Sequence, residues 1–324
     1  MRELLQKAEE SRTSLESKLR SEGTDCHRLF HGVAEGKPGL TIDRYGPLVL
    51  AQTFREPLES PEVDFLSEYY GEMFVYNHRG DRSELFTHHQ PHSKALEPVT
   101  AHELGLKYSI VARHRGIDPH LFLDLRMGRR WVLSQARGKT VLNLFAYSCG
   151  LGQVACAGGA EEVWNVDFSA SALEVGRRNL ELNELSSANV RFIQEDYFPV
   201  IWQLSGVGVK GKRARRKHKK FAQKQFDLVL LDPPAKAKGP FHTVDLVNDY
   251  QSVFKPAWLT TAPGGTLMAC NNVGSVSAEE FERVLTSCAV KAGKPIQDIQ
   301  WLSPDEDFPS FDGSHPLKVA ICNG

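Results

Sequence analysis

Residues 141–152 read Val141-Leu-Asn-Leu-Phe-Ala-Tyr-Ser-Cys-Gly150-Leu-Gly152, and this stretch decides the fold. An apolar run of strand length passes directly into a turn of small residues, and a helix-compatible segment follows it. We therefore predict a strand, a tight turn and a helix that begins near Gly150. Without Cβ atoms, Gly150 and Gly152 would let a ligand reach the backbone, where the first N–H groups of the helix point.

A second strand is predicted over Glu162-Val-Trp-Asn-Val-Asp167, so its last residue is a carboxylate. In a doubly wound sheet, a carboxylate at this strand tip can accept hydrogen bonds from both ribose hydroxyls of an adenosine ligand. The two strands therefore predict a nucleotide-binding unit. Because Gly150-x-Gly152-x-x-Ala155 also fits the dinucleotide fingerprint, NAD(P) and S-adenosylmethionine both remain open at this point.

The composition indicates a globular protein with a substantial core. Of the residues, 41% are hydrophobic and 24% are charged. The length of 324 residues leaves room for one large domain and a smaller one, or for two medium ones. No apolar run reaches about 18 residues and the N-terminus is charged, so we expect a cytoplasmic protein without a membrane span or secretory signal. The six cysteines lack CxxC or Cys/His spacing, which argues against a disulfide framework and against a metal site.

Positive charge is concentrated in residues 210–224, here called the basic segment. The segment contains nine Lys and Arg and no acid, which leaves 30 bases against 40 acids in the rest of the chain. A compact basic segment on an acidic body predicts contact with a polyanion, and we favour nucleic acid over the alternative of a solvated loop.

The apolar spacing predicts three parts: an N-terminal helix in residues 1–26, a small strand-rich α+β domain over 27–117, and an α/β domain over 118–324. The first α/β elements are a helix over 123–136 and strands at 141–146, 162–167, 189–193 and 226–232. Strands at 265–270, 296–302 and 317–322 follow, and helices are predicted at 169–183, 244–261 and 277–292. This alternation predicts a Rossmann-like, mostly parallel seven-stranded sheet. The last two strands are joined by a Pro- and Asp-rich loop, so an antiparallel final strand is expected.

Phe226-Asp-Leu-Val-Leu-Leu-Asp232-Pro-Pro234 places a third carboxylate at a strand tip. The two prolines have fixed φ angles and no N–H donors, so they predict a rigid turn at the carboxyl edge of the sheet. Asp232 would then face the same crevice as Gly150 and Asp167. Asp196, after the strand at 189–193, would lie at another tip and could accept a hydrogen bond from an adenine amino group.

Further motifs are Phe122-Leu-Asp124-x-Arg126-x-x-Arg129-Arg130, Val166-Asp167-x-Ser169, Asn179-Leu-x-x-Asn183, and upstream Arg28-Leu-Phe-His-Gly and Pro38-Gly-Leu-Thr-Ile-Asp43-Arg-Tyr. With the stretches ending at Gly150 and Pro234, they make most of residues 27–322 resemble the bacterial large-subunit (23S) rRNA methyltransferases. That family depends on S-adenosylmethionine and includes a cytosine-5 and a guanine-N7 enzyme. The resemblance implies a Rossmann-like class I methyltransferase domain preceded by a strand-rich module.

The resemblance also implies roles for individual residues. It places Phe122, Asp124 and Arg126 at the methionine end of the cofactor, with Phe145, Tyr147, Cys149 and Gly150 in the loop beneath it. Asp167 would bind the ribose, Asp196 the adenine, and Asp232-Pro233-Pro234 the edge where the target base meets the methyl group. No RNA-binding PUA module, which some members carry, is recognised in the sequence. RNA docking is therefore expected from the basic segment, through Lys212, Arg213, Arg215, Arg216, Lys217, Lys219 and Lys220.

One departure from the cytosine-5 members bears on the target atom. Where they place a catalytic cysteine, counting from Gly264-Gly265 puts Asn272 here, with Cys270 two residues earlier; the Asn271-Asn272 pair resembles the guanine-N7 relative. Cytosine C5 is a poor nucleophile until a thiolate adds at C6, so that chemistry needs a cysteine. Guanine N7 has its own lone pair and needs only alignment with the sulfonium methyl. We therefore expect Asn272 to contact the base and interpret Cys270 as a buried residue at a strand end.

The favoured hypothesis is an S-adenosylmethionine-dependent RNA methyltransferase. Its expected target is a base of 23S rRNA, free or in a pre-ribosomal particle, with guanine N7 favoured. Three alternatives remain: a cytosine-5 methyltransferase that uses Cys270, an NAD(P)-dependent oxidoreductase, and a non-catalytic RNA-binding assembly factor with a relic cofactor pocket. The oxidoreductase alternative gives no role to Asp232 and its two prolines.

Overall fold

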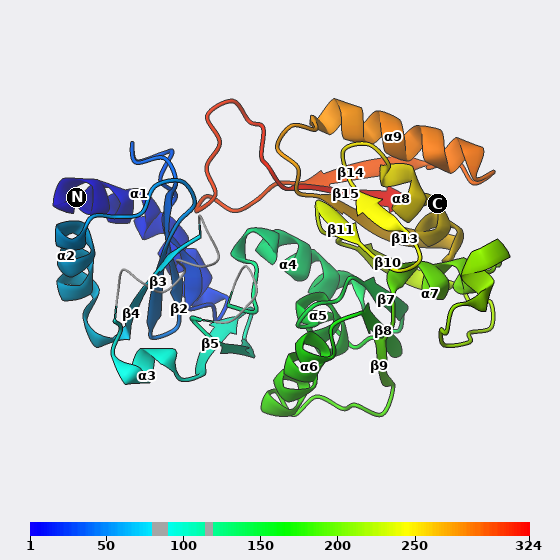
Figure 1. The fold of residues 1–324 in the computed structure, drawn as a ribbon, viewed down its shortest axis with the longest axis horizontal. Coiled ribbons are helices and arrows are strands. Elements are labelled where there is room, and N and C mark those ends of the chain that lie inside the picture. Colours follow the sequence, from blue (N-terminus) through cyan, green and yellow to red (C-terminus); the bar gives the residue numbers. More distant parts are fainter. Residues whose placement is uncertain (80–89, 114–118) are drawn as a thin grey trace. The chain divides into compact units, whose positions relative to one another are not determined.

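The computed structural model describes residues 1–79, 90–113 and 119–324, which form two compact units (Figure 1). Unit 1 contains Met1–Arg126 and Pro304–Gly313, and unit 2 contains Met127–Ser303 and Ser314–Gly324. The boundary predicted between residues 117 and 118 lies outside the described residues. The inclusion of a C-terminal segment in unit 1 was not foreseen from the sequence.

Unit 1 is built on a four-stranded sheet with the order β1-β2-β3-β4. Adjacent strands are antiparallel except for β3 and β4, which are parallel because helix α2 connects them. The elements of this unit are α1 (Arg2–Ser21), β1 (Cys26–Phe30), β2 (Leu40–Tyr45), β3 (Leu48–Thr53), α2 (Ser60–Tyr70), η1 (Gly71–Met73), β4 (Phe74–His78), α3 (Ser93–Leu96), β5 (Val99–Glu103), β6 (Leu106–Ile110) and η2 (Leu123–Leu125).

Two features of unit 1 follow from its sequence pattern. Leu5 and Ala8 on one face of α1 pack into the same apolar cluster as Phe30 of β1, which explains the helical spacing of the N-terminal leucines. Strands β5 and β6 form an antiparallel hairpin. Leu104 and Gly105 have φ angles of 55° and 74° and form its turn.

Unit 2 contains a seven-stranded sheet with the order β14-β15-β13-β10-β7-β8-β9 (Figure 1). Strand β15 is antiparallel to both neighbours, as predicted for the final strand, and the other pairs are parallel. The elements are α4 (Arg126–Gln135), β7 (Thr140–Leu144), α5 (Gly150–Ala157), β8 (Glu162–Asp167), α6 (Ala170–Leu182), β9 (Val190–Gln194), α7 (Tyr197–Leu204), η3 (Gly211–Arg215), β10 (Phe226–Leu231), β11 (Lys236–Lys238), β12 (Thr243–Asp245), α8 (Tyr250–Leu259), β13 (Thr261–Asn271), α9 (Ala278–Lys291), β14 (Asp298–Leu302) and β15 (Lys318–Asn323).

Helices cover both faces of this sheet. Trp164 and Val166 of β8 belong to the large core cluster that includes residues of α7, α8 and α9. Asn165 points to the opposite face, because successive side chains of a strand alternate, and there it meets α5. After β7 the chain forms β8 and β9, which extend the sheet toward one edge. It then crosses back and forms β10 next to β7, on the side of the other edge, so the strand order reverses between β7 and β10. Ligands of open α/β sheets bind at this switch point.

Helix α7 and the hairpins β5–β6 and β11–β12 were not predicted from the sequence, and the helix expected over 123–136 begins as the single turn η2 before α4. Among the described residues, none of the helices combines the length and apolar character that crossing a bilayer would require.

Arg126 holds the loop between β14 and β15 in unit 1. Its side chain is 1% exposed, and its guanidinium donates to Asp305 at 3.0 Å and to Asp307 at 3.1 Å. Its Nε lies 3.3 Å from the carboxylate of Glu103. Burial alone would lower the pKa of Arg126, but the charges of Asp307 and Glu103 raise it above its ordinary value. Arg126 is therefore a buried cation that joins three acidic side chains from distant parts of the sequence.

Candidate active site

The turn between β7 and α5 has a strained backbone. Phe145, Tyr147 and Cys149 have φ angles of 56°, 48° and 62°, in the left-handed region that residues with a Cβ atom seldom adopt. Each such residue costs on the order of 1–3 kcal/mol, so the surroundings must hold the turn in place. Part of that support is the N–H of Ala146, which donates to the carbonyl oxygen of Val166 in β8 at 3.0 Å.

Asp167, the last residue of β8, supplies further support. Its Oδ2 accepts a hydrogen bond from the N–H of Tyr147 at 2.8 Å, and its Oδ1 accepts one from Ser169 at 2.8 Å. The residue is 8% exposed. Burial raises the pKa of Asp167, although the backbone N–H groups oppose the rise. Each carboxylate oxygen offers two lone pairs, so Asp167 can brace the turn and still accept from a ligand hydroxyl.

Gly152 serves helix packing rather than ligand access. A Cβ atom at Gly152 would lie 2.0 Å from Oδ1 of Asn165, which also accepts a hydrogen bond from Asn143 at 2.9 Å. The interpretation of Gly152 as an opening for a ligand is therefore wrong, because its missing Cβ lets α5 approach the sheet. Gly150 is the first residue of α5 and keeps its predicted place at the helix start.

Cys149 is buried in the same turn and packs against α6. A Cβ atom at Gly176 of α6 would lie 2.5 Å from the Sγ of Cys149, so a glycine is required there. Burial raises the pKa of the Cys149 thiol well above its ordinary value, and the charge of Asp167 adds to the effect. The thiol is therefore a packing group that holds the turn against the helix.

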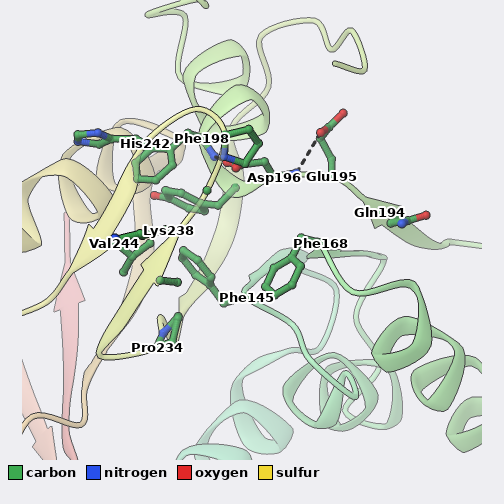
Figure 2. Close-up of a pocket in the computed structure, with 14 residues that line it drawn as sticks. Phe145, Phe168, Gln194, Glu195, Asp196, Phe198, Pro234, Lys238, His242 and Val244 are labelled. Carbon is green, nitrogen blue, oxygen red and sulfur yellow. Dashed lines mark hydrogen bonds between the residues drawn. The ribbon is translucent and has the colours of Figure 1, made fainter. Parts of the chain in front are cut away.

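A pocket of about 340 Å³ adjoins the turn within unit 2 (Figure 2). This volume is within the range of small-molecule sites. The lining residues come from the tips of β7, β8, β9 and β10, from the start of α7 and from the hairpin β11–β12. They are Phe145, Phe168, Gln194, Glu195, Asp196, Tyr197, Phe198, Pro234, Ala237, Lys238, Gly239, Pro240, His242 and Val244.

Aromatic rings form part of the pocket wall. Phe145 stacks on Tyr197, with ring centroids 4.5 Å apart and planes 22° from parallel. Phe168 is 69% exposed, and both Phe168 and Phe145 line the pocket (Figure 2). An exposed ring at a pocket edge offers a stacking surface for a planar ligand. Sequence reasoning missed Phe168, although its position directly after the carboxylate of Asp167 was a usable signal.

Asp196 stands at the start of α7 and also faces the pocket. Its Oδ1 accepts a hydrogen bond from the N–H of Phe198 at 2.9 Å and so caps the helix. Burial raises the pKa of Asp196, and the neighbouring charge of Glu195 contributes. A Cβ atom at Gly239 would lie 2.5 Å from the Oδ2 of Asp196, so the hairpin β11–β12 can come this close only with glycine at that position.

Asp232, Pro233 and Pro234 follow β10 at the same edge of the sheet. Pro234 lines the pocket, Pro233 is buried, and Asp232 is half-buried. Tyr250, at the start of α8, donates its hydroxyl to the carbonyl oxygen of Cys270 at 3.0 Å. Burial raises the pKa of Tyr250 well above its ordinary value, and the charge of Asp232 is one of the contributing causes. Tyr250 therefore braces the end of β13.

Three residues at the end of β13, which the sequence placed near the target base, differ in their exposure to solvent. Cys270 and Asn271 are the last two residues of the strand, and each is 1% exposed. Asn272 follows the strand and is exposed. The Oδ1 of Asn271 accepts a hydrogen bond from the N–H of Val273 at 2.9 Å and closes a turn around Asn272. Asn272 is thus the member of the three that is open to a substrate.

The basic segment lies on the surface and is anchored next to the pocket. The N–H of Lys219 donates to the carboxylate of Glu195, a pocket residue, at 2.8 Å, and the N–H of Phe221 donates to Gln203 of α7 at 3.2 Å. Lys224 forms an ion pair with Glu162 at the start of β8. The predicted RNA-binding side chains are all exposed: Lys212, Arg213, Arg215, Arg216, Lys217, Lys219 and Lys220.

Unit 2 brings most of the predicted site residues to one sheet edge, whereas Phe122, Asp124 and Arg126 belong to unit 1. Phe122 is 40% exposed, and Asp124 contributes to the raised pKa of Arg28. The guanidinium of Arg126 is occupied by carboxylates of its own unit. The predicted contact of these three residues with a cofactor stays a prediction.

The fold and the site define a class of protein. A parallel α/β sheet with the antiparallel strand β15 inserted between β13 and β14, and with carboxylates at successive strand tips, is the arrangement of class I methyltransferases. The sequence profile of the S-adenosylmethionine-dependent methyltransferases matches residues 27–322, and the chain belongs to this family. It is therefore an enzyme that uses S-adenosylmethionine, and the nicotinamide alternative no longer applies.

Relatives and solved structures agree with this assignment. The chain is 30% identical to ribosomal RNA large subunit methyltransferase I of Aeromonas hydrophila, over 99% of this chain and 77% of the relative. The protein of the same name from Shigella flexneri is 28% identical, over 94% and 74% of the two chains. A structure from Streptococcus mutans, described as an S-adenosylmethionine-dependent methyltransferase, has a TM-score of 0.79 at 24% identity and covers 99% of this chain and 80% of that one. An Agrobacterium tumefaciens methyltransferase has a TM-score of 0.65 at 19% identity, over 92% and 89%.

Proposed function

We propose that this enzyme methylates a base of large-subunit ribosomal RNA and that the acceptor atom is guanine N7. The names of the similar relatives support ribosomal RNA as the substrate. The observation that carries the choice of atom is the end of β13, where the exposed side chain is that of Asn272 and the thiol of Cys270 belongs to a residue only 1% exposed.

The residues of unit 2 fit the cofactor. In this proposal Phe168 stacks on the adenine, Asp196 accepts from its amino group, and Asp167 accepts from the ribose while it braces the turn at Tyr147. A buried carboxylate at Asp167, a half-buried one at Asp196 and the exposed ring of Phe168 suit the polar and planar parts of an adenosine. When bound, the cofactor supplies a methyl group on a positively charged sulfur.

The chemistry of the nucleobases supports a purine as the methyl acceptor. The lone pair of guanine N7 can attack the methyl group directly, so the protein has to hold the base in line and needs no nucleophile. The amide of Asn272 can both donate to and accept from the edge of a purine. A cytosine-5 reaction would require the thiolate of Cys270 to reach C6 of the base from a buried position.

The target atom is tested by methyl transfer to ribosomal RNA from a strain that lacks the enzyme, followed by mass spectrometry of the nucleosides. We expect 7-methylguanosine, near-normal activity for Cys270→Ser, and a loss on the order of 100-fold for Asn272→Ala through misalignment. Covalent trapping of RNA that contains 5-fluorocytidine through Cys270, together with 5-methylcytidine as the product, would overturn the choice of guanine N7.

The basic segment is proposed to hold the RNA, because its exposed Lys and Arg side chains adjoin Glu195 at the pocket. Neutralising Lys212, Arg213, Arg215 and Arg216 should weaken RNA binding and reduce the slope of log K against log salt by about 3 if each contacts one phosphate. The matched control neutralises four exposed bases of α1: Arg2, Lys7, Lys18 and Arg20. An unchanged slope in the first variant, or an equal change in the control, would refute a dedicated RNA surface.

A further inference from the structure

Lys318, the first residue of β15, is a buried lysine. It lies at the edge of the sheet where the parallel strands have their carboxyl ends, next to the end of β13. It is 7% exposed, and its ammonium donates to the carbonyl oxygens of Val273 at 2.7 Å and Pro316 at 2.8 Å. Within the part of the chain that the structure describes, it has no ion pair with a carboxylate. Burial lowers the pKa of Lys318. An ammonium without a counter-charge is costly to bury, so a neutral side chain would be the cheaper choice for stability alone.

The hydrogen bond to Val273 shows what Lys318 does. Asn271 is paired with Lys318 across β13 and β15, and Asn272 and Val273 follow directly. The side chain of Asn271 accepts from the N–H of Val273 at 2.9 Å, while Lys318 donates to the C=O of the same residue. The N–H of Val273 is therefore fixed by Asn271, and its C=O by Lys318. Asn272 is the exposed residue inside this turn.

The same strand end is braced from a second direction. The hydroxyl of Tyr250 donates to the carbonyl oxygen of Cys270 at 3.0 Å. The backbone on both sides of Asn272 is thus held by side chains from β15, from α8 and from β13 itself. Such support limits the positions that an exposed side chain can take, which is what alignment of a reacting base demands.

We propose that Lys318 is a positioning residue for Asn272. Its ammonium fixes the turn over residues 271–273, so that the amide of Asn272 meets the target base in one orientation. The inference rests on the proposed function of Asn272 at the base. It gives Lys318 no contact with the reacting atoms, and it explains why a charged side chain is retained in a buried place.

The test replaces Lys318 by Met, which keeps the length of the side chain and removes its donors. Single-turnover methyl transfer should fall about 10- to 100-fold, because small errors of alignment lower rates on this scale. The affinity for S-adenosylhomocysteine should stay within about twofold. The unfolding temperature should be unchanged or higher, because the variant no longer buries a charge.

Lys294→Met is the matched control. Lys294 also donates to two carbonyl oxygens of β13, those of Thr261 at 2.8 Å and Ala262 at 3.2 Å, and burial also lowers its pKa. These contacts lie at the opposite end of the same strand. The control should transfer methyl groups at the wild-type rate. An equal loss in both variants would show that Lys318 acts only through the stability of β13.

A double-mutant cycle shows whether Lys318 acts through Asn272. The variant Lys318→Met/Asn272→Ala should be no slower than Asn272→Ala alone, because the turn then has no amide to present. Additive losses would overturn the proposal, and so would full activity of Lys318→Met. If the Met variant fails to bind S-adenosylhomocysteine, Asn271→Ala tests the other support of the turn and should show the same lack of additivity.

The outcomes also separate this inference from the proposed function. A product methylated on another atom would refute guanine N7, while the cycle would still report whether Lys318 and Asn272 are coupled in that reaction. A 7-methylguanosine product with additive losses would keep the proposed function and refute the role of Lys318.

Discussion

Replacement of Asp167 by Asn tests whether one carboxylate both braces the strained turn and receives the ribose. The amide has nearly the size of the carboxylate but offers a single acceptor oxygen. In the wild type, Tyr147 and Ser169 each donate an N–H to a different oxygen at 2.8 Å. In the variant, one of these N–H groups must face the NH₂ group instead.

The size of the effect on stability and on cofactor affinity follows from the hydrogen bonds that a carboxylate at this position accepts. A hydrogen bond to a charged acceptor contributes about 1.5–3 kcal/mol, and a buried N–H left without an acceptor costs about 1–3 kcal/mol. Part of this loss is offset, because the variant no longer buries a charge: burial raises the pKa of Asp167 and makes its ionised form less favourable in the folded protein. We expect binding of S-adenosylhomocysteine to weaken by about 1–3 kcal/mol, or roughly 5- to 150-fold in Kd.

The dependence on pH has a definite sign. Because the folded pKa of Asp167 is raised, its contribution to stability is present below the unfolded pKa of about 3.9 and is lost as pH rises through the folded value. Cofactor binding has the opposite trend, since the ionised form is the better acceptor. Wild-type affinity should therefore fall as pH drops through the raised pKa, whereas the Asn variant should show no such fall in that range.

Isothermal titration calorimetry with S-adenosylhomocysteine and thermal unfolding without ligand measure the two effects. Ser169→Ala is the control, since it keeps the Ser169 N–H and removes only the hydroxyl, which caps α6 by accepting from Ala172 at 3.2 Å and lies 3.1 Å from the hydroxyl of Ser171. It should cost about 1 kcal/mol of stability and leave cofactor affinity unchanged. If Asp167→Asn bound S-adenosylhomocysteine as tightly as the wild type with the same pH dependence, Asp167 would not belong to the cofactor site.

Three further predictions concern packing. Gly152→Ala should lower the free energy of unfolding by about 1–3 kcal/mol in urea denaturation, because its Cβ would lie 2.0 Å from Asn165; unchanged stability would mean that α5 shifts freely. Arg126→Met should cost about 3–5 kcal/mol, since buried carboxylates lose their cation; a more stable variant would contradict this. Cys149, whose pKa burial raises, should react with iodoacetamide only after unfolding, as peptide mass spectrometry would show; rapid labelling of the native protein would refute its packing role.

Much of unit 2 could be predicted from local sequence. The periods of the apolar residues located the sheet strands and several helices, because each element must bury one face. The Pro- and Asp-rich loop before residue 317 indicated an antiparallel final strand, which the pairing of β15 with β13 confirms. Carboxylates at strand ends were visible as Asp167 and Asp232, since the carboxyl ends of parallel strands share one edge.

Other features are made by residues that are distant in the chain, so no local pattern signals them. The burial of Arg126 depends on Asp305 and Asp307, about 180 positions later, and this contact draws the loop between β14 and β15 into unit 1. The hairpin β11–β12 is short and weakly patterned, and its place at the pocket depends on the close approach of Gly239 to Asp196.

The sequence by itself determined the order of the seven sheet strands along unit 2, the family resemblance and the strand tips that carry carboxylates, because these depend on neighbouring residues and on their periodicity. Only the tertiary structure decided what Gly152 accommodates, which member of Cys270, Asn271 and Asn272 is exposed, and that Lys318 supports their turn. The physical reason is the same in each case. Close approach, burial and a hydrogen bond from β15 to the turn after β13 exist only after distant segments pack together.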